Sequence, residues 1–128
     1  MSEVLSSLCV APLYGQVVVA CEGASDLPVP ETGQERVVAT TQSLLIATRG
    51  DQDGDVLIEV HRGQDGDDFG EQVFDGELSF TSPRLVFGSS LAGELASAEL
   101  DRTGWVPIKV YVQPASSPSR VVVVLPDV

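Results

Sequence analysis

The chain has 128 residues, of which 43% are hydrophobic, and no apolar run approaches the length of ~20 residues that a membrane span needs. Nineteen acidic residues face seven basic ones, so the net charge is −12. Such a surface repels nucleic acid and anionic membranes, because both are polyanions. If the charge serves a function, the partner is basic or cationic; the alternative is that the acidity only keeps a valine-rich protein soluble.

Residues 1–14 are expected to form a first strand or an ordered arm, because Pro12 breaks any helix there. The start carries Glu3 and lacks a basic region, which makes it a poor signal peptide and predicts a cytoplasmic protein. Cys9 and Cys21 lack a CxxC spacing. They are expected to be reduced and buried as small hydrophobic residues; a disulfide between neighbouring strands is the alternative.

The next segments alternate between strands and breaks. Gln16–Glu22 contains an unbroken apolar run, which predicts a strand that is central or covered on both faces. Pro28 and Pro30 then mark a loop. Arg36–Arg49 is rich in β-forming residues but exceeds the usual strand length, so we expect one bent strand or two strands. The bend is placed at Thr40–Ser43.

The clearest strand is Val56–Arg62, in which the hydrophobic pattern has a period of two. The pattern places Val56, Ile58 and Val60 on one face and Leu57, Glu59 and His61 on the other. The tetrapeptide Gln-Asp-Gly-Asp stands at both ends of the strand. Asp-Gly is a strong turn signal, because glycine adopts positive φ at no steric cost.

The second half of the chain repeats this pattern of short strands and turns. The expected strands are Gln72–Phe80, Arg84–Phe87, Ala98–Leu100, Trp105–Gln113 and Val121–Leu125. Gly76 is the expected site of a β-bulge. A short helix at Leu91–Leu95 is the alternative to the strand at Ala98–Leu100.

The Trp105–Gln113 strand has two distinct faces. One consists of Val106, Ile108, Val110 and Val112, and the other of Trp105, Pro107, Lys109 and Tyr111. Because Pro107 has no N–H, the strand is expected at a sheet edge or with the proline at its non-bonded side. Trp105, Lys109 and Tyr111 are a candidate binding patch, with packing of Trp105 against a second layer as the alternative.

Eight or nine strands with little helix predict an all-β protein. We expect a single antiparallel β-sandwich domain over residues 1–128, with a barrel as the alternative. The chain is long enough to bury a core without disulfides.

An acidic band is the most distinctive surface feature, with ten acids and one formal base from Asp51 to Glu77. The candidate partner-binding residues within it are Asp51, Asp53, Asp55, Glu59, Asp65, Asp67 and Asp68. The intervening strand separates the two aspartate loops by roughly 25 Å, which is too far for one ion site. An extended acidic surface suits a basic protein partner better than a small ligand.

The sequence gives little support for a metal site or a catalytic site. Asp51, Asp53 and Asp55 occupy positions 1, 3 and 5 of an EF-hand pattern, but its positions 6 and 12 hold Val56 and Arg62 instead of glycine and glutamate. His61 is the only histidine, so no multi-histidine metal site can form; we expect it on the surface or on the second face of its strand. The chain is therefore predicted to be non-enzymatic, without metal or cofactor.

Four segments carry a resemblance to a known family: Val56–His61, Asp75–Leu78, Arg84–Gly88 and Gly104–Tyr111. In these segments the chain resembles a small bacterial β-sandwich family related to the ComJ competence protein. The resemblance implies an inhibitor of a partner nuclease, or an immunity protein that acts against a toxin. It agrees with the charge, because a nuclease presents a basic cleft to its polyanionic substrate.

The leading hypothesis is an acidic protein that inhibits a basic nuclease or toxin, with its oligomeric state left open. Charge reversal at Asp65, Asp67 and Asp68 should then slow association, most at low salt. The alternative is a structural or assembly protein, such as a phage or secretion-apparatus component, that pairs through its strand edges. A third possibility is an enzyme or a cation-dependent sugar-binding module.

Overall fold

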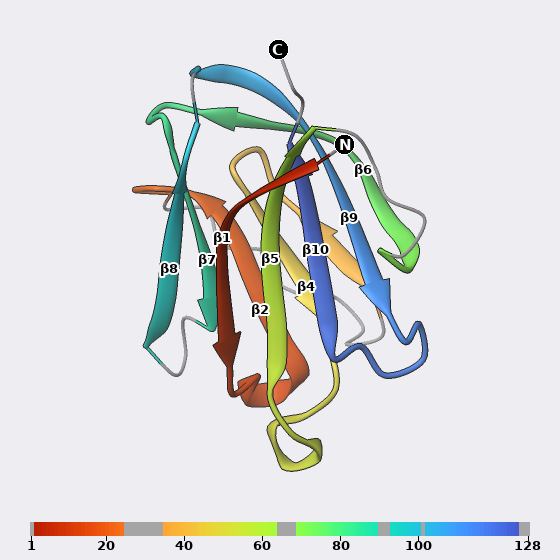
Figure 1. Ribbon diagram of the computed structural model, residues 1–128. Helices are drawn as coiled ribbons and strands as arrows, with labels where there is room; N and C mark the ends of the chain where they lie inside the picture. The colour runs from red at the N-terminus through yellow and green to blue at the C-terminus, as the bar shows by residue number, and fades with distance from the viewer. Residues whose placement is uncertain (1, 25–34, 64–68, 90–92, 101, 126–128) are drawn as a thin grey trace.

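The computed structural model describes residues 2–24, 35–63, 69–89, 93–100 and 102–125. Within them ten strands form two five-stranded sheets that pack face to face as a sandwich (Figure 1). Sheet A has the order β1 (Ser2–Val10), β5 (Val56–Gly63), β10 (Arg120–Leu125), β9 (Gly104–Gln113), β6 (Glu71–Phe80). Sheet B has the order β3 (Val37–Ala39), β4 (Ser43–Ala47), β2 (Gln16–Cys21), β7 (Arg84–Ser89), β8 (Glu94–Glu99). The predicted β-sandwich is confirmed.

The pairings are antiparallel, as expected, except that β5 and β10 run parallel, with Ile58 opposite Val121. The chain reaches β10 from the loop that follows β9. The N–H of Leu57 donates to the carbonyl of Ser119 over 2.9 Å, so β5 and β10 start at the same end of the sandwich. We call this the lower end, as it appears in Figure 1. It also carries two short 3-10 turns, η1 (Leu13–Gly15) and η2 (Asp51–Asp53).

The core lies between the sheets and follows the two-residue period of the sequence. On β5 the predicted inward residues Val56, Ile58 and Val60 are fully buried. β2 is central in sheet B and buried over most of its length, as predicted. Each fully buried valine, leucine or isoleucine side chain contributes about 1.5–3 kcal/mol relative to an exposed one. Branched aliphatic residues on pleated surfaces therefore supply most of the hydrophobic stabilisation.

The segment 36–49 forms two strands, the second of the alternatives considered above. β3 and β4 pair as a hairpin, and the N–H of Thr40 donates to the carbonyl of Ser43 over 2.8 Å. The N–H of Ser43 also donates to the Thr40 hydroxyl over 3.1 Å. The polar residues at 40–43 therefore fold back on themselves and close the turn.

The prediction of a bulge at Gly76 is wrong. Gly76 stays in register opposite Ile108, and the pairing of β6 with β9 shifts between Gln72 and Phe74 instead. The glycine makes room for a ring, because a Cβ at Gly76 would lie 2.8 Å from the Cζ atom of Phe74.

Two other strands differ in detail from the prediction. β8 begins at Glu94, four residues earlier than expected, so Glu94 and Leu95 belong to a strand and not to a helix. β9 is an interior strand, flanked by β10 and β6. The pairing of β9 with β10 covers only residues from Lys109 onward. Pro107 precedes this part of β9 and pairs with β6 alone, opposite Glu77. The missing N–H of the proline is therefore tolerated.

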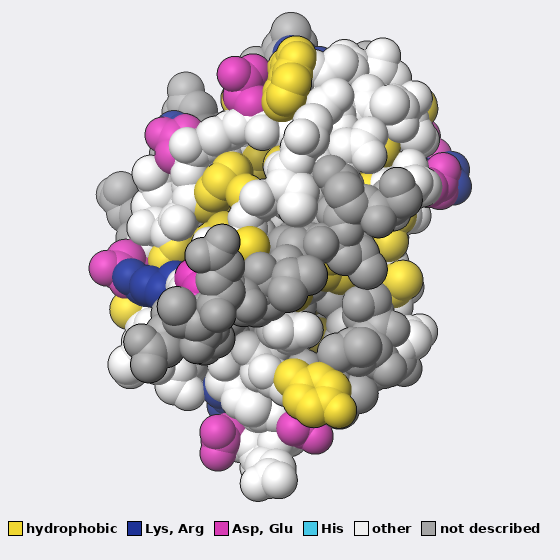
Figure 2. Space-filling view, turned by 180° about the vertical axis from the view of Figure 1, so that it is seen from behind, with side chains coloured by type: hydrophobic (Ala, Val, Ile, Leu, Met, Phe, Trp, Pro, Cys, Tyr) yellow, Lys and Arg dark blue, Asp and Glu magenta, His cyan; other side chains and the backbone are white. Residues whose placement is uncertain are grey.

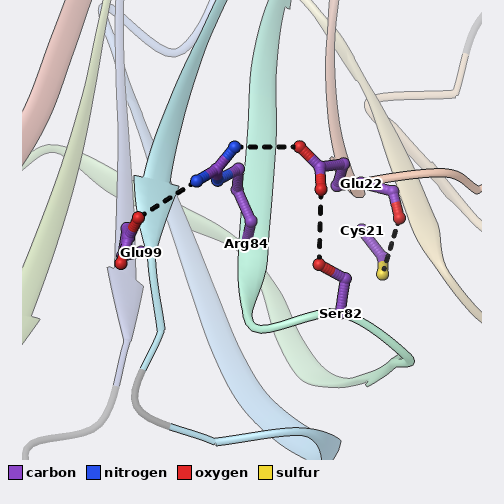
Figure 3. Close-up of polar contacts among 5 residues, drawn as sticks. All are labelled: Cys21, Glu22, Ser82, Arg84 and Glu99. Carbon is purple, nitrogen blue, oxygen red and sulfur yellow. Dashed lines mark hydrogen bonds and ion pairs between the residues drawn. The ribbon is translucent and has the colours of Figure 1, made fainter.

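At the end of the sandwich opposite the lower end, Arg84 at the start of β7 contacts glutamates from both strands that flank β7 (Figure 3). Glu22 directly follows β2, and Glu99 ends β8. Its Nη1 lies 3.3 Å from Oε2 of Glu22 and its Nη2 lies 3.1 Å from Oε1 of Glu99. The hydrogen bond to Glu99 and the charge of Glu22 raise the pKa of Arg84 above its usual value. The guanidinium therefore stays charged at any pH at which the protein is handled.

Cys9 and Cys21 are both free thiols, as expected. Cys21 is buried in the core, but the prediction of burial is wrong for Cys9, which is exposed. The reason is register: Cys9 pairs with Leu57, whose side chain points away from sheet B.

Candidate functional site

Three of the predicted partner-binding acids gather at the lower end. Asp51, Asp53 and Asp55 are all exposed, on and just after η2. Arg49 holds this turn, and its Nε donates to the backbone carbonyl of Asp55 over 3.1 Å. The guanidinium of Arg49 thus binds the backbone that follows the turn, while the three carboxylates are exposed.

The η2 turn packs against η1, which carries the exposed ring of Tyr14. The N–H of Thr48, close before η2, donates to the carbonyl of Gly15 over 2.8 Å. Tyr14 has φ 61° and ψ 19°, in the left-handed region, which is unusual for a bulky residue. Its side chain is 84% exposed. A tight turn therefore projects an aromatic ring beside the acidic residues.

A pocket opens beside Tyr14 on the face of sheet B turned away from sheet A. Its volume is about 170 Å³, and it is lined by Tyr14, Gly15, Gln16, Glu35, Val38, Leu45 and Ala47. Val38 and Leu45 are cross-strand partners, as are Gln16 and Ala47. Figure 2 shows this face of the molecule, with a hydrophobic side chain near the lower end and acidic side chains below it.

Glu59, another predicted site residue, has a different environment. It lies on the outer face of sheet A, and its side chain is only 18% exposed. Its Oε1 accepts hydrogen bonds from Nε and Nη2 of Arg120 at 2.8 and 2.6 Å. The charge of Glu59 is therefore balanced within the protein, which reduces its contribution to the acidic surface.

His61 lies on the second face of β5, as expected, but it is covered, with an exposure of 5%. The ring of Phe69 lies edge-on to it, with 4.8 Å between the ring centroids, and Nε2 of His61 is 3.6 Å from Oε1 of Glu59. Phe69 also packs with Tyr111, Val122 and Val124 as a small second hydrophobic cluster. This cover could not be predicted, because Phe69 stands near the end of a strongly acidic loop.

The candidate patch on β9 is divided by the same cluster. Tyr111 is buried and its hydroxyl donates to Oε1 of Gln72 over 3.0 Å, whereas Trp105 is 61% exposed. The two rings therefore do not share one binding surface.

Asp65, Asp67 and Asp68, the remaining predicted site residues, lie outside the described residues.

Tyr14 was missed by the sequence analysis. Its signal is the run Pro12-Leu13-Tyr14-Gly15, in which proline and glycine bracket a tight turn between two strands. An aromatic residue in so short a turn has little room to fold back into the core. The degree of its exposure depends on the packing of η1 against η2, which the local sequence does not reveal.

Two kinds of site are not found in the described part of the chain. No group of three or more histidine, cysteine, aspartate or glutamate side chains there is placed to hold a metal ion. None of the helices among these residues has the length and apolar character needed to cross a membrane.

Comparisons with known proteins give one informative result. No family model and no curated protein matches the sequence. Among solved structures, the chain is similar to the crystal structure of ComJ from Bacillus subtilis, an inhibitor of the DNA-degrading activity of NucA. The identity is 13% and the TM-score is 0.75, over 100% of this chain and 99% of that one. The resemblance seen in four segments of the sequence thus extends over the whole chain as a shared fold: this protein has the fold of ComJ.

Proposed function

We propose that this chain is a non-enzymatic inhibitor that binds a basic, DNA-degrading nuclease through the acidic lower end of its sandwich. The observation that carries the proposal is the exposure of Asp51, Asp53 and Asp55 on a turn that Arg49 holds in place. The fold shared with an inhibitor of a nuclease supports it.

The inhibition would follow from charge. A nuclease binds a polyanion, so its cleft is lined with cations. Exposed carboxylates compete for the same cations and speed the encounter of the two proteins, since oppositely charged surfaces attract over long range. Asp65, Asp67 and Asp68 remain candidates for a second part of this acidic surface.

The edge strands argue against the alternative of self-assembly. β3 has only three residues, and the pairings of β1 and β6 with their neighbours are irregular at Val4/Ser6 and Gln72/Phe74. The fourth edge strand, β8, carries exposed Glu94 and Glu99 at its ends. Short, irregular or charged edges hinder pairing between copies. Sizing at two concentrations checks this point, and a defined oligomer would favour assembly.

The proposed function is tested by capture at low salt. The purified chain is immobilised, exposed to a lysate of the source organism, and washed, and bound proteins are released by a salt step. The eluate should degrade DNA after desalting and should lose that activity when the purified chain is added back. An eluate without DNA-degrading activity, or with activity that the chain does not reduce, would contradict the proposal.

A further inference from the structure

The pocket beside Tyr14 has the size of a single side chain. Its volume of about 170 Å³ is well below the roughly 300–1,000 Å³ of pockets that hold small molecules. A nucleotide or a comparable ligand would therefore leave most of its surface in water. A side chain that projects from a partner protein fits this space.

The lining of the pocket selects the kind of side chain. Val38, Leu45 and Ala47 are the apolar part of the lining, which we call the floor, and Tyr14 and Glu35 line the pocket beside them. Exposed Asp51 and Asp53 lie on the adjacent turn. An amphipathic cation matches this combination, because its aliphatic stem covers apolar surface while its charged head stays near water and carboxylates.

We propose that this pocket receives an arginine side chain of the partner. Its methylene groups lie over Val38, Leu45 and Ala47, and its planar guanidinium lies against the ring of Tyr14. Arginine is favoured over lysine because its delocalised cation stacks on aromatic faces and is more weakly hydrated. Tyrosine and arginine, together with tryptophan, are also enriched among the residues that dominate the binding energy of protein interfaces.

This inference rests on the proposed function, since it assigns the residue through which a basic protein partner would be recognised. A measurement without the partner tests the pocket separately from the inhibitor function. The probe is N-acetyl-arginine amide, titrated into the ¹⁵N-labelled protein while amide chemical shifts are recorded. We expect saturable shifts of the amides of Gly15, Gln16, Val38, Leu45 and Ala47. N-acetyl-citrulline amide, which has nearly the same shape but no charge, should shift them much less at equal concentration.

Three variants locate the binding. Tyr14→Phe keeps the ring and should keep the response. Tyr14→Asn removes the ring while retaining a residue that tolerates positive φ, and should weaken binding roughly two- to fivefold, as expected for an exposed cation–π contact. Ala47→Leu fills the floor without altering Tyr14 and should also weaken it. Melting curves confirm that each variant is folded.

The proposal is overturned if the arginine probe leaves these amides unchanged, if citrulline amide shifts them equally, or if Tyr14→Asn and Ala47→Leu bind as well as the parent. The capture assay then separates the two claims. If Tyr14→Asn inhibited the captured nuclease with the same half-inhibitory concentration as the parent, the pocket would be rejected and the inhibitor function left intact. A saturable arginine response without any captured nuclease would reject the function and leave the pocket intact.

Discussion

Arg120 and Glu59 join the parallel strands β10 and β5 on the outer face of sheet A, through two hydrogen bonds from one guanidinium to one carboxylate oxygen. Their side chains are only 26% and 18% exposed. A hydrogen-bonded pair that is this far removed from water is screened less than a surface pair. The pair therefore links two parallel strands that no short turn connects.

Replacing Arg120 with methionine should lower the free energy of unfolding by about 1–3 kcal/mol, because it leaves the carboxylate of Glu59 partly buried without its main donor. Urea denaturation measures this change. Arg36→Met is the matched control: Arg36 pairs with Glu71, but both side chains are about half exposed. Breaking such a surface pair should cost less than about 1 kcal/mol. Equal losses in the two variants would show that the Glu59 pair has no special weight.

Phe69 should be essential for covering the outer face of sheet A. Its ring is 4% exposed and packs over Tyr111, Val122 and Val124. Phe69→Ala should cost about 3–5 kcal/mol, the usual loss for a buried aromatic side chain. Thermal unfolding checks this value. Tyr111→Phe, which removes only the hydroxyl that donates to Gln72, should cost about 0.5–1.5 kcal/mol. A loss below 1 kcal/mol for Phe69→Ala would mean that the cluster contributes little.

Gly88 should tolerate no side chain. It has φ +140°, and a Cβ there would lie 2.2 Å from the carbonyl oxygen of Glu94 on the neighbouring strand. Gly88→Ala should therefore destabilise the protein by roughly 3 kcal/mol or more, from strain and overpacking together. Gly93→Ala is the control, because Gly93 has φ +72° but open space around it. It should cost about 1–2 kcal/mol. Similar melting temperatures for the two variants would contradict this reading of the β7–β8 pairing.

The fold could be predicted from the sequence because the core is periodic. Val56, Ile58 and Val60 recur at every second position, and a half-buried strand is the structure in which that spacing buries one face. The parallel neighbours β5 and β10 could not be predicted, since Glu59 and Arg120 are 61 residues apart. Nothing in the local pattern of either strand specifies its partner.

The candidate site could be predicted only in part, for a related reason. Acidic turns are visible in the sequence, and Asp51, Asp53 and Asp55 are exposed as a turn implies. The pairing of Glu59 with Arg120 and the exposure of Tyr14 depend on which strands and turns meet in space. Charge and turn chemistry are local properties, whereas the neutralisation of a carboxylate or the exposure of a ring is decided by tertiary packing.

Charge reversal at the η2 turn should slow association with the nuclease. Asp51→Lys combined with Asp53→Lys should lower the association rate constant by about tenfold or more at low ionic strength, with a smaller effect at high salt. Surface plasmon resonance at two salt concentrations measures it. Asp75→Lys combined with Glu77→Lys changes the charge equally, at exposed positions on β6. If both double variants slow association to the same extent, net charge matters and the η2 turn has no special role.

The most direct measurement is the rate of DNA degradation by the captured nuclease as the purified chain is added in increasing amounts. The account predicts that activity falls linearly to near zero at a fixed stoichiometric ratio at low salt. It also predicts that the double variant at Asp51 and Asp53 needs a large excess to reach the same inhibition. Unchanged degradation at a several-fold excess of the folded chain would contradict the account.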